Sequence, residues 1–223
     1  MDERQALMWL RLCPGLNAAA RHCLLRMGGC AREAVTLARR RNLAGPSRLY
    51  LQKCLDAAWV GWDDPLYPPR LRHLDDCPEV LFYRGQLQGL QQVRLAVAIV
   101  GTRRPTSTGR QLASRFARHL AGCGASVVSG LALGIDSAAH WASLDPSTGF
   151  PIAVVGCGLD YCYPAENSQL LQQIEQRGVV LSEHPPGTPP QRWHFPARNR
   201  ILAALSHAIL VVEAPVRSGA IIT

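Results

Sequence analysis

Two adjacent arginines, Arg103 and Arg104, follow a short apolar run and a glycine in the stretch VAIVGTRRPTSTG, residues 97–109. A guanidinium group binds phosphate through two parallel hydrogen bonds, and the hydroxyl of Thr102 can donate another. Gly101 lets the backbone approach a ligand closely. The pattern predicts a phosphate-binding turn. The alternative is that small residues at a strand end only permit a tight turn.

A second basic cluster, RWHFPARNR, covers residues 192–200. Three arginines and three aromatic side chains alternate in it: Arg192, Trp193, His194, Phe195, Arg198 and Arg200. Arginines that hold phosphates and aromatic rings that stack on bases are what a groove for single-stranded nucleic acid needs. An arginine-rich helix start with its aromatic residues in the core fits the composition equally well.

The elements that must position these clusters are apolar runs of about five to eight residues. The runs are RLAVAIVG, ASVVSG, PIAVVGCG, GVVLSEH and AILVVEA, with amphipathic stretches between most of them. Continuous apolar strands that alternate with helices predict a doubly wound α/β domain with a mostly parallel, Rossmann-like sheet. Its ligands are expected at the carboxyl ends of the strands, where Ser129 and Gly130 end the second run. Each helix that follows a strand is expected to offer N–H groups to an anion.

The rest of the chain divides into two further parts. Residues 1–60 show apolar positions at helical spacing, which predicts a small all-α domain. Residues 61–92 are rich in proline and aspartate and are interpreted as an irregular connector with one short strand, VLFYRG. The Rossmann-like domain is expected over residues 93–223, with a new helix beginning at SGAIIT and the domain incomplete at its carboxyl end.

Composition limits the classes of protein. The 223 residues are 48% hydrophobic, which is enough for a sizeable core, and the net charge of +8 favours a polyanionic partner. We find no apolar run that could span a bilayer and no signal region after Met1, so we expect a cytoplasmic protein without membrane contact. The eight cysteines form no CxxC pair, and free, mostly buried thiols are expected rather than a metal site.

The sequence fits poorly with two common kinds of nucleotide-binding enzyme. No GxGxxG follows the first strand and no Walker loop occurs, which disfavours hydride transfer and P-loop hydrolysis. Three titratable side chains remain as candidates for acid–base work. Asp136 and His140 share one face of a predicted helix, and Glu213 ends the last strand. Asp136 could equally cap that helix, and the pair could be structural.

Taken together in order, these strand-end loops resemble the bacterial DNA-processing protein A family. The resemblance is dense over residues 93–223, and the amino-terminal part is similar to the sterile-alpha-motif-like domain of that family. It implies a cofactor-free protein that binds single-stranded DNA without cutting it, acts in natural transformation, protects incoming strands and loads the recombinase RecA. The DNA contacts that the resemblance implies are Gly101, Thr102, Arg103, Phe195, Arg198, Asn199 and Arg200. The predicted DNA site also includes Arg104 from the phosphate-binding turn, and Ser129 and Gly130, whose loop lies at the same edge of the sheet.

The resemblance leaves two matters open. The family pattern continues past SGAIIT and often ends in a winged-helix domain, and the family's dimer contacts and much of its RecA-binding surface lie in that part. Homodimerisation and RecA loading are therefore uncertain for residues 1–223. The rival is a nucleotide phosphoribohydrolase of the lysine-decarboxylase-like group, which would use Asp136 or Glu213 as its carboxylate, although the PGGxGTxxE motif of those enzymes is absent.

Overall fold

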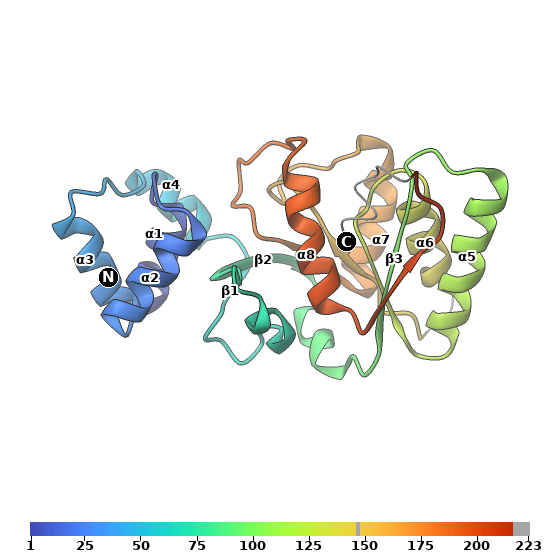
Figure 1. Cartoon of the computed structure of the whole chain (residues 1–223), viewed down its shortest axis with the longest axis horizontal. Coiled ribbons are helices and arrows are strands. Elements are labelled where there is room, and N and C mark those ends of the chain that lie inside the picture. Colours follow the sequence, from blue (N-terminus) through green and yellow to red (C-terminus); the bar gives the residue numbers. More distant parts are fainter. Residues whose placement is uncertain (146–147, 216–223) are drawn as a thin grey trace. The chain divides into compact units, whose positions relative to one another are not determined.

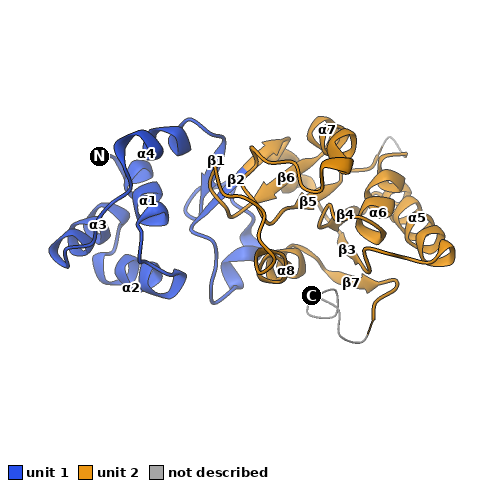
Figure 2. Cartoon of the chain, turned by 90° about the horizontal axis from the view of Figure 1, so that it is seen from above, with its two compact units in different colours: residues 1–82 blue, residues 83–223 orange. Residues whose placement is uncertain are grey.

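A computed structural model describes residues 1–145 and 148–215 (Figure 1). The chain separates into two compact units, Met1–Phe82 and Tyr83–Thr223, coloured separately in Figure 2. The division falls inside the segment that the sequence analysis interpreted as a connector. Each unit is described by itself below.

Four helices form the amino-terminal part of the first unit. They are α1 (Glu3–Leu12), α2 (Ala18–Gly28), α3 (Ala31–Arg40) and α4 (Arg48–Leu55). Three of them begin at a side chain that accepts a backbone N–H of the first turn, namely Asp2, Asn17 and Ser47. Helices thus form where the apolar spacing predicted them, in a compact unit that extends past residue 60 to Phe82.

Two antiparallel strands follow the helices. Strand β1 (Trp59–Gly61) pairs with β2 (Val80–Gly85), with Trp59 opposite Phe82. The sequence predicted β2 as VLFYRG, and it missed β1, which has too few residues to show an alternation. The connection contains a 3-10 helix, η1 (Pro69–His73), within the stretch predicted to be irregular.

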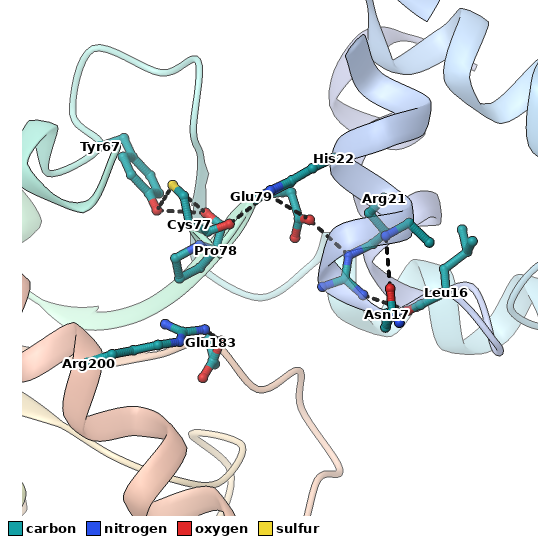
Figure 3. A network of polar contacts seen from close by, with 11 residues as sticks. Leu16, Asn17, Arg21, His22, Tyr67, Cys77, Pro78, Glu79, Glu183 and Arg200 are labelled. Atoms are coloured by element: carbon teal, nitrogen blue, oxygen red, sulfur yellow. Dashed lines mark hydrogen bonds and ion pairs between the residues drawn. The ribbon is translucent and has the colours of Figure 1, made fainter. Parts of the chain in front are cut away.

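A buried ion pair joins α2 to the residue before β2 (Figure 3). The Nε atom of Arg21 donates to Oε1 of Glu79 at 3.0 Å, and Arg21 also donates to the Leu16 carbonyl at 2.7 Å. His22 Nε2 lies 3.2 Å from the same Glu79 oxygen. Arg21 is 8% exposed and Glu79 is 1% exposed, so the ion pair is shielded from water. Arg21 and His22 both contact the Glu79 carboxylate through Oε1, and Oε2 is buried without a hydrogen-bond partner in the described structure.

Five parallel strands form the sheet of the second unit, as predicted. They are β3 (Ala96–Val100), β4 (Ser126–Ser129), β5 (Ile152–Val154), β6 (Val179–Ser182) and β7 (Ala208–Val211). Their order is β6-β5-β4-β3-β7, with Ala98 beside both Val128 of β4 and Ile209 of β7. After β6 the chain reverses and crosses back over the sheet. Strand β7 therefore pairs with β3, on the side of β3 that faces away from β4.

That reversal decides which face each helix covers. The helices α5 (Ser107–Gly122), α6 (Ile135–Leu144) and α7 (Ser168–Arg177) connect strands that advance one way along the sheet, and α8 (His194–Leu205) makes the return. Because parallel crossovers are right-handed, the return places α8 on the opposite face, as Figure 2 shows. Short 3-10 helices, η2 (Leu87–Gln92) and η3 (Ala165–Asn167), complete the unit.

Alanines bring α5 close to the rest of its layer. Ala113, Ala117 and Ala121 recur every four residues on its buried face, and the first two share a core cluster with Ile99 of β3 and Ile135 of α6. Small side chains at this spacing let the helix pack closely against its neighbours.

Three further expectations from the sequence can be compared with the structure. The cysteines are free, but four of the eight are buried rather than most of them: Cys13, Cys54, Cys77 and Cys157. Within residues 1–145 and 148–215, no helix has the length and apolar character to cross a membrane. The helix expected at SGAIIT lies outside the described residues.

Candidate nucleic-acid interface

A pocket of about 670 Å³ opens at the carboxyl edge of the parallel sheet. Segments that follow all five strands contribute to it, as expected for a ligand site in a doubly wound fold. We call it the arginine pocket. Its lining residues are Val100, Gly101, Thr102, Arg103, Arg104, Ala132, Asp136, Tyr163, Arg192, Phe195, Pro196, Arg198, Asn199, Leu202 and Pro215.

The loop after β3 is held from both sides at Thr102. Its N–H donates to the Glu213 carbonyl at 2.7 Å, and its carbonyl accepts the N–H of Ile135, the first residue of α6, at 3.2 Å. The Thr102 hydroxyl accepts the Arg104 N–H at 3.2 Å and can still donate its own hydrogen to an anion. The two exposed arginines therefore project from a backbone that is fixed in place.

The buried side chains of Arg198 and Asp136 also line the pocket. Arg198 donates to the Val154 carbonyl, and its Nε atom is buried with no hydrogen-bond partner in the described structure. Burial lowers the pKa of Arg198 to about 10, and the nearby Asp136 carboxylate opposes that change. Arg198 therefore stays positively charged at neutral pH.

Asp136 is held by the loop that precedes its helix. Its Oδ2 accepts the N–H of Gly130 at 3.0 Å and that of Ala132 at 3.4 Å. Burial raises the pKa of this carboxyl, and the Arg198 guanidinium together with the two N–H groups offsets part of the rise. Gly134 is the N-cap of α6, so the alternative that Asp136 caps this helix is wrong, and Asp136 instead orders the β4–α6 loop.

Aromatic rings stand beside the charges of the pocket. The guanidinium carbon of Arg103 lies 4.9 Å from the centre of the Phe195 ring, and the Tyr163 ring lies 5.4 Å from Phe195. Phe195 is half-buried and Tyr163 is exposed. The arrangement places a cation and two aromatic rings at one pocket, which suits a phosphate with an attached base.

The structure brings most of the predicted site residues together. Seven line the arginine pocket: Gly101, Thr102, Arg103, Arg104, Phe195, Arg198 and Asn199. Gly130 lines an adjoining hollow of about 40 Å³ that shares Arg103 and Phe195 with the pocket. A Cβ at Gly130 would lie 2.3 Å from Nη1 of Arg198, so only glycine leaves room for that guanidinium.

Two predicted residues lie outside both hollows. Ser129 is fully buried, and its hydroxyl donates to the Ile99 carbonyl of β3 at 2.6 Å. Arg200 forms an ion pair with Glu183 at 2.6 Å, drawn in Figure 3. These contacts give Ser129 and Arg200 structural roles in the sheet and in the placement of α8.

The start of α5 does not stand open to a ligand, contrary to the sequence-based expectation. The Thr106 N–H lies 3.1 Å from each carboxylate oxygen of Glu213, and the Thr106 hydroxyl donates to the same group at 2.8 Å. Glu213, a candidate for acid–base work in the sequence analysis, therefore places its negative charge at the amino terminus of α5.

His140, the other half of the suggested acid–base pair, is completely buried in α6. Burial lowers its pKa to about 4, from about 6.5 in an unfolded chain. Between these values the unfolded chain binds a proton that the folded chain does not. The free energy of unfolding should therefore fall by up to about 1.4 kcal/mol per pH unit on acidification through this window.

Urea unfolding followed by circular dichroism at a series of pH values measures that dependence. His140→Gln should reduce the slope between pH 6.5 and 4, and His119→Gln, at an exposed position of α5, should keep the wild-type slope. Equal slopes for His140→Gln and wild type would show that His140 is not the group responsible.

Sequence reasoning missed two contributors to the pocket as individual site residues. Tyr163 lies in the loop GCGLDYCYP, which was noted for its glycines, and an aromatic residue in such a strand-end loop was the available signal. Arg192 was counted in its cluster but not selected. Ala132, Pro196 and Pro215 carried no signal of their own.

The fold and the pocket define a class of Rossmann-like proteins for which solved structures exist. DNA processing protein A from Streptococcus pneumoniae superimposes with a TM-score of 0.84 at 33% identity, covering 100% of this chain and 82% of that protein. DNA processing protein A from Helicobacter pylori gives a TM-score of 0.67 at 35% identity, covering 75% and 74%. The Helicobacter pylori structure is described in terms of a single-stranded DNA binding mode.

Residues 58–223 match the model of the family described as DNA recombination-mediator protein A, and the chain belongs to that family. Protein Smf from Synechocystis is 48% identical over 163 residues, or 72% of this chain and 41% of the relative. DNA processing protein DprA from Bacillus subtilis is 43% identical over 157 residues, or 70% and 52%. The chain thus spans about half the length of the curated relatives that it matches.

Proposed function

We propose that this chain binds single-stranded DNA in the arginine pocket. The observation that carries the proposal is Arg103 over the ring of Phe195 at the edge of a pocket that is also lined by the buried cation Arg198. Free phosphate groups and unstacked bases occur together in single strands, whereas a duplex hides the base faces. The Helicobacter pylori relative, with its single-stranded DNA binding mode, supports the same substrate.

Each part of the pocket has a separate task in this proposal. Arg103 and Arg104 pair with backbone phosphates, and the Thr102 hydroxyl donates to a phosphate oxygen. Phe195 stacks on a base, which tolerates any sequence because every base has a π-face. Arg198 lies too deep to follow the strand and adds a fixed positive charge that attracts the phosphate from below.

For the whole protein we propose the role of the family resemblance: protection of incoming single strands in natural transformation and loading of the recombinase RecA, as a cytoplasmic homodimer. We also propose that the pocket is non-catalytic. The carboxylates that a phosphoribohydrolase would need accept hydrogen bonds from the protein itself, Asp136 from the β4–α6 loop and Glu213 from Thr106.

Fluorescence anisotropy with a labelled oligothymidylate across a salt series tests the proposal. Arg103→Ala should weaken binding by about 10- to 150-fold, because a hydrogen bond to a charged group contributes about 1.5–3 kcal/mol. The logarithmic salt slope should also fall by about 0.7, the value for one phosphate contact on a single strand.

Arg115→Ala is the matched control, because it removes the same charge from an exposed position of α5 that does not line the pocket. Its affinity should stay within about twofold of wild type. If Arg103→Ala and Arg115→Ala bind equally well, the DNA site lies elsewhere. Release of free base from a nucleoside monophosphate, lost in Asp136→Asn, would favour the enzyme instead.

A further inference from the structure

Trp193 is the most exposed aromatic side chain in the described part of the protein, at 68%. A tryptophan left in water forgoes a large hydrophobic gain, and tryptophan is enriched at contact surfaces. The residue is the N-cap of α8 by position, but its side chain makes no capping hydrogen bond. Capping of α8 therefore does not explain why a tryptophan occupies this position.

Among the described residues, the indole ring makes one ring contact, with its chain neighbour His194. It meets the His194 ring edge-on, with centroids 5.9 Å apart and planes at 80°. His194 in turn stacks on His184 at 4.0 Å and donates from Nδ1 to the Gly156 carbonyl at 3.0 Å. The contact with a ring that is itself fixed reduces the conformational freedom that the indole would lose when a ligand binds.

Trp193 stands directly beside the arginine pocket. Its chain neighbour Arg192 lines the pocket, and so does Phe195 two residues further on. Consecutive Cα atoms are about 3.8 Å apart, so the backbone of Trp193 directly adjoins that of Arg192, a cation of the pocket lining. The indole itself is not part of the lining, so a base stacked on it would lie outside the pocket.

We propose that Trp193 is a second base-stacking position, which receives the base of a nucleotide just outside the arginine pocket while Phe195 stacks on a base inside it. The ligand is an unpaired nucleobase in a strand whose phosphate is held by Arg192. This inference rests on the proposed function and extends it. It assigns a path by which the DNA strand leaves the pocket, and a residue that stacks on a base of any type.

The test compares two strands of equal length and charge, an oligothymidylate and a strand of abasic units. Trp193→Ala should weaken binding of the oligothymidylate by about 5- to 150-fold, the range for the loss of one stacked base. It should leave binding of the abasic strand and the salt slope unchanged. Trp193→Phe should recover most of the affinity, because a phenyl ring still stacks.

Trp141→Ala is the matched control, because Trp141 is also exposed, at 46%, and lies on α6 outside the pocket lining. It should bind both strands as wild type does. Equal losses on both strands for Trp193→Ala, or no loss on either, overturn the stacking position. If Arg103→Ala loses affinity while Trp193→Ala does not, the proposed function stands and this inference fails; if wild type binds neither strand, both fail.

Discussion

Replacing Gly134 by alanine should lower the affinity for single-stranded DNA by about 10- to 150-fold, the equivalent of one charged hydrogen bond. Gly134 has a φ of +85°, and a Cβ there would lie 2.4 Å from the Thr102 carbonyl oxygen and 2.8 Å from the carbonyl carbon of Arg103. Both obstacles are backbone atoms, which cannot rotate away. The loop after β3 must shift, and Arg103 then loses its position over Phe195. Anisotropy at one fixed salt concentration measures the loss.

Gly124→Ala separates collision from backbone strain. Gly124 has a similar φ of +79°, but an added Cβ would meet nothing within 4 Å. Gly124→Ala should lose about 1–2 kcal/mol of stability from its positive φ alone, and Gly134→Ala should lose more, because the collision adds to the strain. Only Gly134→Ala should also lose affinity for DNA. Wild-type affinity in Gly134→Ala would mean that the contact between the two loops does not position the binding residues.

Strands β3, β4, β5 and β6 were predictable because burial on both faces leaves an uninterrupted apolar run. Strand β7 is largely exposed, but its residues are apolar as well. AILVVEA predicted β7 correctly, yet nothing in its residues placed it beside β3 rather than at the other edge. Hydrophobic patterns report burial and period, whereas strand order depends on which way each crossover runs. The three residues of β1 were too few to show any period.

Site residues were predictable where charge directly follows a strand. Arg103 and Arg104 stood out for that reason, and they line the pocket. The role of Glu213 was not predictable, because its partner Thr106 lies 107 residues earlier and only the β3–β7 pairing brings the two together. Ser129 shows the opposite limit: a hydroxyl at a strand end looks the same in sequence whether it faces a ligand or, as here, a neighbouring strand.

Arg21→Ala should lower the free energy of unfolding of the first unit by about 3–5 kcal/mol, because it leaves the Glu79 carboxylate buried without its cation. Urea unfolding of the whole chain, with hydrogen exchange of peptides from residues 1–82, assigns the loss to this unit. Arg32→Ala is the control. Arg32 contacts Glu3 at a similar 3.2 Å, but the two side chains are 66% and 39% exposed, and such pairs contribute about 1 kcal/mol or less.

A double variant distinguishes charge from packing. Glu79→Leu alone leaves the buried guanidinium of Arg21 without its carboxylate, and Arg21→Met alone leaves the Glu79 carboxylate without its cation. Each single change should therefore lower the free energy of unfolding. Replacing both side chains by apolar ones of similar volume removes both uncompensated charges and should recover more than half of the loss, because buried ion pairs contribute little beyond an apolar contact. A double variant no more stable than either single one would place the cost in the packing of α2 against the segment before β2, with the ion pair a consequence of that packing.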